Sequence, residues 1–330
     1  MQLGRVECLR LTPVMRALIV GCGYVGFSLG AELARRGHEV FGLRRSTSSD
    51  DALKAAGIVP LRGDITHPES LKQLPRDFDW VVNCVASGGG DAEEYRQLYL
   101  HGMRNLIEWL VPGSAGLCPA SSSNNPAATR RQDGGAPRVI YTSSTGVYGQ
   151  NDGSLVDETR STEPATETAS VLVQAEKVLL AAGVERQFPA IVLRAAGIYG
   201  PERGYLLKQF LRGEARIEGS GARILNMIHR DDLIGAIIAA LERGRAGEIY
   251  NVVDDAPVSQ LEFFKWLAAK LDKPLPPTAA EDSTTPRKRR LTNKRISNAK
   301  LKAELGFEFQ HPDYRAGYSS EILRLGIAGG

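Results

Sequence analysis

The chain is poor in cysteine and in long apolar runs. Only four cysteines occur among 330 residues, and no two of them form a Cys-x-x-C pair. This pattern predicts reduced thiols and argues against a zinc or other metal site. No apolar run approaches the roughly 20 residues that a membrane helix needs, and residues 1–14 lack the apolar segment of a secretory signal. We therefore expect a protein of the cytoplasm, or of another reducing compartment, with no membrane partner.

An excess of charge of one sign is also missing. The chain has 41 Lys and Arg against 38 Asp and Glu, a formal net charge of +3, which is too small to demand a nucleic-acid partner. One basic run stands out within residues 287–295, made of Arg287, Lys288, Arg289, Arg290, Lys294 and Arg295. A nucleic-acid patch is one interpretation. The run lacks interleaved aromatic residues, so a solvated or phosphate-facing surface is the favoured one.

Apolar residues make up 42% of the chain, and short apolar runs alternate with helical patterns. This alternation predicts an α/β fold of the Rossmann type, a doubly wound parallel sheet with helices on both faces. The expected strands are 16–20, 39–43, 58–61, 79–85, 138–142 and 190–194. The expected helices between them are 25–36, 92–111 and 169–182.

The regular alternation of apolar strands and helical patterns changes after residue 194, which predicts a second lobe. We expect a nucleotide-binding domain over 15–196, preceded by a loose extension at 1–14 and followed by a C-terminal substrate lobe over 197–330. The strands expected in this lobe are 215–217, 225–228 and 248–253, its helices are 231–242 and 259–271, and segments near 225–253 return to the core. Residues 112–137 are rich in Ser, Ala, Asn, Pro and Gly, which predicts a flexible insertion or, alternatively, a lid.

The most informative motif is Gly-x-Gly-x-x-Gly at Gly21, Gly23 and Gly26, between an apolar strand and a helical pattern. Gly21 permits a tight turn, Gly23 lets the backbone approach a diphosphate, and Gly26 allows close packing of helix on strand. Tyr24 and Val25 open the helix, whose free N–H groups and positive dipole end favour phosphate. The motif predicts a bound dinucleotide.

The end of the second strand indicates which dinucleotide. An acidic residue there binds the ribose hydroxyls of NAD, but this strand ends in Arg44, Arg45 and Ser46. Because a guanidinium fork pairs well with phosphate, these residues predict NADP(H). The alternative is a pair of solvated surface arginines.

Further cofactor contacts are expected where the next two strands end. Asp64 and Ile65 follow the third strand, and the Asp64 carboxylate could accept from an adenine amino group or simply cap its loop. Val85, Ala86 and Ser87 follow the fourth strand, and small residues there permit close approach of a cofactor.

Taken together, these residues resemble the extended short-chain dehydrogenase/reductases, the NAD-dependent epimerase/dehydratase group. The resemblance covers about residues 15–325 and looks closest to an atypical branch labelled nucleoside-diphosphate-sugar epimerase-like. It rests on Gly21–Gly26, Gly63-Asp64, Tyr141–Gly149, Arg194–Pro201, Ile228–Asp232, Tyr250–Val252 and Asn293–Asn298. The resemblance implies a C-terminal lobe that closes over a small polar or sugar-nucleotide substrate, and a homodimer formed through helices 92–111 and 169–182.

The same resemblance implies a Ser/Thr–Tyr–Lys catalytic group, of which only the first member is found. Ser144 matches the Ser/Thr position, although its hydroxyl could also cap a turn. None of the ten tyrosines has a lysine four residues later. If Glu176 marks the usual helix register, then Thr168 stands at the tyrosine position and Leu172 at the lysine position.

A substitute proton donor is therefore expected among residues that converge on the site in this family. The candidates are Tyr148, Tyr199, Tyr99 and His229, and each could instead have a packing role. The pKa of an unperturbed histidine suits proton transfer.

Three functions follow from these observations. The first is an NADP(H)-dependent oxidoreductase or epimerase-like enzyme that uses Ser144 and a non-standard proton donor. The second is a non-catalytic NADP(H)-binding sensor or scaffold, which the missing Tyr and Lys favour. The third is an RNA- or phosphate-binding protein, which only the basic run supports.

Overall fold

A parallel β-sheet organises the chain in the computed structural model, which describes residues 13–111, 135–279 and 292–327. Its order is β11-β7-β5-β4-β1-β2-β3, and every neighbouring pair is parallel. The strands are β1 (Arg16–Val20), β2 (Glu39–Arg44), β3 (Ile58–Arg62), β4 (Trp80–Asn83), β5 (Arg138–Ser144), β7 (Ala190–Ala195) and β11 (Ile249–Val252). The predicted α/β fold with a doubly wound parallel sheet is thus confirmed.

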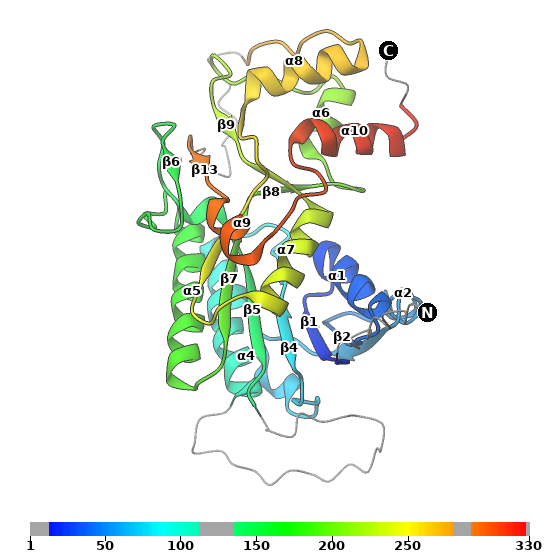
Figure 1. Cartoon of the computed structure of the whole chain (residues 1–330), viewed down its shortest axis with the longest axis vertical. Helices are drawn as coiled ribbons and strands as arrows, with labels where there is room; N and C mark the ends of the chain where they lie inside the picture. The colour runs from blue at the N-terminus through cyan, green and yellow to red at the C-terminus, as the bar shows by residue number, and fades with distance from the viewer. Residues whose placement is uncertain (1–12, 112–134, 280–291, 328–330) are drawn as a thin grey trace, which may run out of the picture.

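Helices cover both faces of this sheet (Figure 1). Side chains alternate along a strand, so Ala17 and Ile19 face one apolar core while Leu18 and Val20 face the other. The first core is completed by α1 (Tyr24–Arg35), α2 (Asp50–Ala55), α7 (Arg230–Arg243) and α9 (Ala299–Leu305). The second is completed mainly by α4 (Gly102–Leu110) and α5 (Glu167–Glu185).

The expected helix over 92–111 is continuous but irregular. It begins as α3 (Ala92–Tyr95), continues as a π-helical segment η2 (Arg96–His101), and ends as α4. π-Helical turns interrupt the regular hydrogen-bond ladder and occur often at functional sites. Tyr99 belongs to this π-helical segment.

The elements beyond the sheet gather past the carboxyl ends of its strands (Figure 1). They are α6 (Tyr205–Leu211), α8 (Gln260–Leu271) and α10 (Tyr314–Arg324), with the small strand pairs β8 (Gly197–Tyr199) with β10 (Met227–His229) and β9 (Ile224–Leu225) with β12 (Val258–Ser259). A third apolar core lies here, rich in aromatic side chains such as Phe263, Phe264 and Tyr318.

Two predicted strands of this region differ from the structure. Residues 215–217 form no strand, because Ile217 makes only a single bridge with Thr278. The expected strand 225–228 is divided at Asn226 into β9 and β10. The Asn226 side chain explains the division, since it binds the backbone of the segment that carries β13 (Arg295–Ile296), which itself pairs with β6 (Leu155–Val156).

The basic run does not form one solvated surface. Lys294 is buried, and its Nζ donates to the Tyr148 carbonyl oxygen at 2.6 Å and to Thr292 Oγ1 at 2.7 Å. Burial lowers its pKa to about 8. The expectation of a solvated residue is therefore wrong at Lys294, while Arg295 is exposed. Residues 287–291, and residues 112–134 of the predicted insertion, lie outside the described residues.

No helix among the described segments is both long enough and apolar enough to cross a membrane.

Candidate functional site

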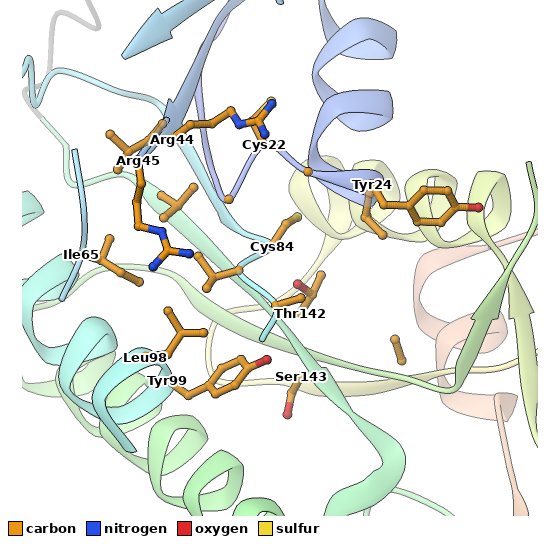
Figure 2. A pocket seen from close by; sticks show the side chains of 18 of the residues that line it. Cys22, Tyr24, Arg44, Arg45, Ile65, Cys84, Leu98, Tyr99, Thr142 and Ser143 are labelled. Atoms are coloured by element: carbon orange, nitrogen blue, oxygen red, sulfur yellow. The ribbon is translucent and has the colours of Figure 1, made fainter. Parts of the chain in front are cut away.

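A cavity of about 500 Å³ lies at the carboxyl ends of the central strands (Figure 2). It sits where the chain order reverses, since β1 has β2 on one side and β4 on the other. Ligands of open α/β sheets bind at such a point. Its wall combines the turn after β1, the ends of β2, β4 and β5, the π-helical segment, and Arg203 from the β8–α6 turn.

The glycine turn forms one wall for identifiable steric reasons. Gly21 has φ +80°, and a Cβ there would stand 2.7 Å from the backbone of Val85. A Cβ at Gly26 would stand 2.5 Å from the Gly21 carbonyl oxygen. A Cβ at Gly23 would meet no protein atom within 4 Å. Gly21 and Gly26 therefore permit the turn itself, whereas Gly23 faces open space at the start of α1.

Three polar residues at and just after the end of β2, where the adenosine end is predicted, reach the same cavity. Arg44, Arg45 and Ser46 all line it, and Arg45 points into it (Figure 2). Arg45 Nη1 lies 4.0 Å from Asp64 Oδ2. Within the described parts of the chain, Arg44 has no ion pair.

Asp64 and Ile65 also line the cavity. Asp64 Oδ1 accepts from the backbone N of Thr66 at 2.9 Å and from its hydroxyl at 2.7 Å, as a loop cap does. Partial burial would raise the pKa of Asp64, but these two hydrogen bonds and the charges of Arg45 and His67 outweigh it and hold the pKa below its usual range.

Of the three residues predicted to contact the cofactor after β4, two line the cavity and one does not. Val85 and Ala86 line the cavity. Ser87 does not, and its backbone N donates to the Tyr99 hydroxyl oxygen at 2.8 Å. Gly26, likewise, lies behind the turn and not on the cavity wall.

Of the four residues predicted for catalysis, Ser144 lines the cavity. Its Oγ accepts from the backbone N of Gly146 at 3.0 Å, so the hydroxyl hydrogen can still be donated. The neighbouring hydroxyls are committed, because Thr142 Oγ1 donates to the Asn83 carbonyl oxygen and Ser143 Oγ donates to Glu176.

Tyr148 lies outside the cavity and is completely buried. Its hydroxyl oxygen accepts from Arg194 Nη1 at 2.7 Å and donates to Asn251 Oδ1 at 3.0 Å. Burial raises the pKa of Tyr148, and Arg194 and Asn251 offset only part of the rise. The geometry gives this phenol a structural partner on each side.

Tyr199 and His229 also lie away from the cavity wall, and both are buried. The Tyr199 ring stacks on Tyr318 with centroids 4.3 Å apart. His229 Nδ1 accepts from the backbone N of Asp231 at 3.2 Å, so His229 caps α7. Burial, together with the nearby His311, lowers the pKa of His229.

His229, Asp232 and His311 form a group whose potential ligand atoms lie within 4.8 Å of one another. The two imidazole rings are tilted with respect to each other, with centroids 3.8 Å apart and planes 31° apart. Asp232 Oδ2 is 3.1 Å from His311 Nδ1 and also accepts from the His311 backbone N. This arrangement fits an ion pair that anchors the segment before α10.

The two residues expected at the family's lysine and tyrosine positions, Leu172 and Thr168, lie in different places relative to the cavity. Leu172 lines the cavity, whereas Thr168 lies at the start of α5 with its hydroxyl 3.1 Å from that of Thr166. Tyr99 lines the cavity, and its hydroxyl points toward Thr142 and Ser143 (Figure 2). Among the tyrosines and histidine weighed as proton donors, Tyr99 alone borders this cavity.

The sequence reasoning did not single out Arg203, Thr142 or Ser143, which also line the cavity. The two hydroxyl residues end a parallel strand, and that position alone could have drawn attention to them. Arg203 carries no comparable local signal, because a turn distant in the sequence brings it to the site.

A parallel sheet with a glycine turn and a cavity at its switch point defines a Rossmann-fold protein. A sequence model of the NAD dependent epimerase/dehydratase family matches residues 17–253. The chain belongs to this family.

Three similar proteins illustrate the relationship. Protein YeeZ of Escherichia coli K12 is 28% identical over 306 residues, covering 90% of this chain and 97% of that protein. Short-chain dehydrogenase/reductase family 42E member 1 of Macaca fascicularis is 30% identical over 290 residues, covering 78% of this chain and 67% of that protein. The dTDP-glucose 4,6-dehydratase DesIV of Streptomyces venezuelae, solved with NAD bound, is 21% identical with a TM-score of 0.76. It covers 94% of this chain and 96% of its own.

Proposed function

We propose that this protein is an NADP(H)-dependent oxidoreductase or epimerase-like enzyme that acts on a small polar or sugar-nucleotide substrate. The observation that carries the proposal is that one cavity has the Gly21–Val25 turn on one side and Arg44, Arg45 and Ser46 at its edge. The turn suits a diphosphate, and the arginines suit a further phosphate. The bound NAD of DesIV and the family's name support a nicotinamide cofactor.

The preference for the phosphorylated cofactor rests on charge. The end of β2 carries no carboxylate that would accept from ribose hydroxyls, and Arg44 has no ion pair within the described residues. Arg45 is exposed, and its Nη1 lies 4.0 Å from Asp64 Oδ2. A 2′-phosphate would therefore find two guanidinium groups and the Ser46 hydroxyl at this edge.

Equilibrium binding tests this preference directly. NADPH is expected to bind at least tenfold more tightly than NADH. Replacing Arg44 by Ala is expected to weaken NADPH by about 10- to 100-fold and to leave NADH nearly unchanged. Arg76→Ala removes one exposed positive charge elsewhere and serves as the control. Equal affinity for the two cofactors, or tighter NADH, would refute the assignment to NADP(H).

For the chemistry, we propose Ser144 as the hydrogen-bond donor to a substrate oxygen and Tyr99 as the proton donor. NADPH supplies a hydride when it is bound. Ser144 has a hydroxyl hydrogen to give, and Tyr99 brings a phenol to the same cavity from the π-helical segment. The phenols of Tyr148 and Tyr199 and the imidazole of His229 are buried away from it.

Turnover measurements separate this enzyme from the sensor. NADPH oxidation is followed against a panel of aldehydes, ketones and nucleoside-diphosphate sugars. Tyr99→Phe and Ser144→Ala are each expected to reduce kcat by at least 100-fold, while Tyr199→Phe keeps it. Tight NADPH binding without turnover on any substrate would favour the sensor, which the apolar Leu172 at the cavity wall also supports. The buried Lys294 weakens the case for an RNA-binding surface.

A further inference from the structure

Arg203 occupies a tightly fixed turn between β8 and α6. Gly200 and Arg203 exchange two backbone hydrogen bonds, of 2.7 and 2.9 Å, across Pro201 and Glu202. Glu202 has φ +62°, a left-handed conformation that costs energy for a residue with a side chain. Its carboxylate is held by Arg324 at 2.9 Å, and its carbonyl oxygen accepts from Lys208 Nζ at 2.7 Å. The turn is thus braced in a strained shape, and residues in such shapes cluster at functional sites.

The turn lies against the first residue of α1. The Arg203 guanidinium carbon is 5.2 Å from the centre of the Tyr24 ring, and a Cβ at Gly200 would stand 3.3 Å from the Tyr24 hydroxyl oxygen. Arg230 lies over the same ring, 5.4 Å from its centre. The start of α1 therefore meets two cationic side chains, one from the β8–α6 turn and one from the start of α7.

Among the residues that the structure describes, Arg203 differs from its basic neighbours in having no ion-paired carboxylate. Arg230 pairs with Asp231 at 2.8 Å, and Arg324 pairs with Glu202 and Glu321. Arg203 is exposed, lines the cavity, and forms no ion pair with a carboxylate of the described residues. The first turn of α1 beside it contains no acidic residue. A guanidinium and the positive end of a 12-residue helix thus face one volume, and no carboxylate of the described residues pairs with that guanidinium.

We propose that Arg203 is a clamp on a diphosphate, reaching across the cavity to hold it against the Gly21–Tyr24 turn. This inference rests on the proposed nucleotide function and adds a binding residue from the C-terminal side of the chain. Arg presents parallel N–H donors that match phosphate oxygens, and Tyr24 supports the guanidinium plane by a cation–π contact. We assign the diphosphate to the cofactor, because Arg203 borders the glycine turn.

The test measures equilibrium binding to the full chain, by fluorescence or calorimetry. The ligands are NADPH, 2′-AMP, which has the ribose phosphate but no diphosphate, and UDP-glucose. The variants are Arg203→Ala, Arg203→Lys, and Arg212→Ala as a matched control on an exposed residue of the next helix end. Arg203→Ala is expected to weaken NADPH by about 10- to 100-fold and to leave 2′-AMP unchanged. Arg203→Lys is expected to recover part of the loss. Because Arg203→Ala removes a positive charge, its affinity for NADPH is expected to vary less with salt than that of the wild type.

Each other result has a definite meaning. If Arg203→Ala binds NADPH as tightly as the wild type, the clamp is refuted while the cofactor site stands. If it weakens 2′-AMP equally, the effect is a general disturbance and the clamp is again refuted. If NADPH binding is unchanged but UDP-glucose binding to the NADPH complex is weakened, the diphosphate belongs to the substrate and the assignment to the cofactor is wrong. If the wild type binds no nicotinamide nucleotide, the proposed function itself fails.

Discussion

The buried ion pair between Glu176 and Arg194 makes a quantitative prediction about stability. The two side chains are 3% and 5% exposed, and Arg194 Nη2 lies 2.6 Å from Glu176 Oε2. Ser143 donates to the same carboxylate at 2.5 Å, and Arg194 donates to the Tyr148 hydroxyl oxygen at 2.7 Å. The pair therefore joins α5, β5 and β7 in one polar network inside an apolar core.

Replacing Glu176 by Leu leaves the Arg194 guanidinium buried without its counter-charge. Such a loss costs about 3–5 kcal/mol of unfolding free energy, and Arg194→Met leaves the carboxylate in the same position. The milder Glu176→Gln keeps a hydrogen-bond acceptor and is expected to cost about 2–3 kcal/mol. If the other two variants do not fold, the unfolding free energy of Glu176→Gln can still be measured and compared with that of the wild type.

The double variant Glu176→Leu with Arg194→Met removes both charges together. Apolar pairs of similar volume often replace buried ion pairs at little cost. The hydroxyls of Ser143 and Tyr148 each lose a partner, so a net loss of about 1–3 kcal/mol is expected. Independent effects would instead sum to about 6–10 kcal/mol.

Urea unfolding monitored by far-UV circular dichroism measures these differences, with the slope m confirming a common unfolding transition. The reasoning predicts that the double variant is more stable than either single charge-removing variant. It would be refuted if the double variant lost the sum of the two single losses, or if Glu176→Leu lost less than about 1 kcal/mol.

Two further predictions concern the turn and a buried acid. Gly21→Ala is expected to lower stability by about 1–3 kcal/mol, because φ is +80° and the new Cβ would stand 2.7 Å from the Val85 backbone. Gly23→Ala is expected to keep stability and to weaken NADPH binding. Thermal melts and binding titrations of both variants test this, and equal behaviour of the two variants would contradict it. Burial, with Asp313, Asp255 and Asp232 nearby, raises the pKa of Asp254 to about 8. Because the unfolded carboxyl ionises near 3.8, the folded state loses stability as the pH rises from about 4 to 8, by at most about 1.4 kcal/mol per pH unit. Asp254→Asn is expected to remove this slope in urea titrations at pH 5 and pH 8, and an unchanged slope would show that Asp254 does not cause it.

Much of the central sheet and of the glycine turn could be predicted because their signals are local. The run 16–20, which is apolar after Arg16, became β1 with the predicted bounds, since the four residues that are buried in the sheet are all apolar. Gly21, Gly23 and Gly26 act within six residues of one another, so their spacing alone specifies the turn. Arg44 and Arg45 reach the cavity because the end of a parallel strand fixes where they stand.

The catalytic candidates were harder to place because their orientation depends on distant partners. Tyr148 turns inward to Arg194 and Asn251, which are 46 and 103 residues away in the chain. Lys294 looked like one member of a basic run, yet it binds the Tyr148 carbonyl oxygen across 146 residues. The sequence shows the charge of such a residue, but it does not show whether the side chain is buried or which distant residues it contacts.

The sequence by itself determined the sheet, the glycine turn and the absence of a carboxylate after β2, because strand burial and backbone sterics act over a few residues. Only the tertiary structure decided which side chains share the cavity. It brought Tyr99 and Ser144 to its wall, buried Tyr148, Tyr199 and His229 elsewhere, and carried Arg203 to the start of α1. The physical reason is that these positions follow from the packing of separate layers, whose contacts join residues far apart in the chain.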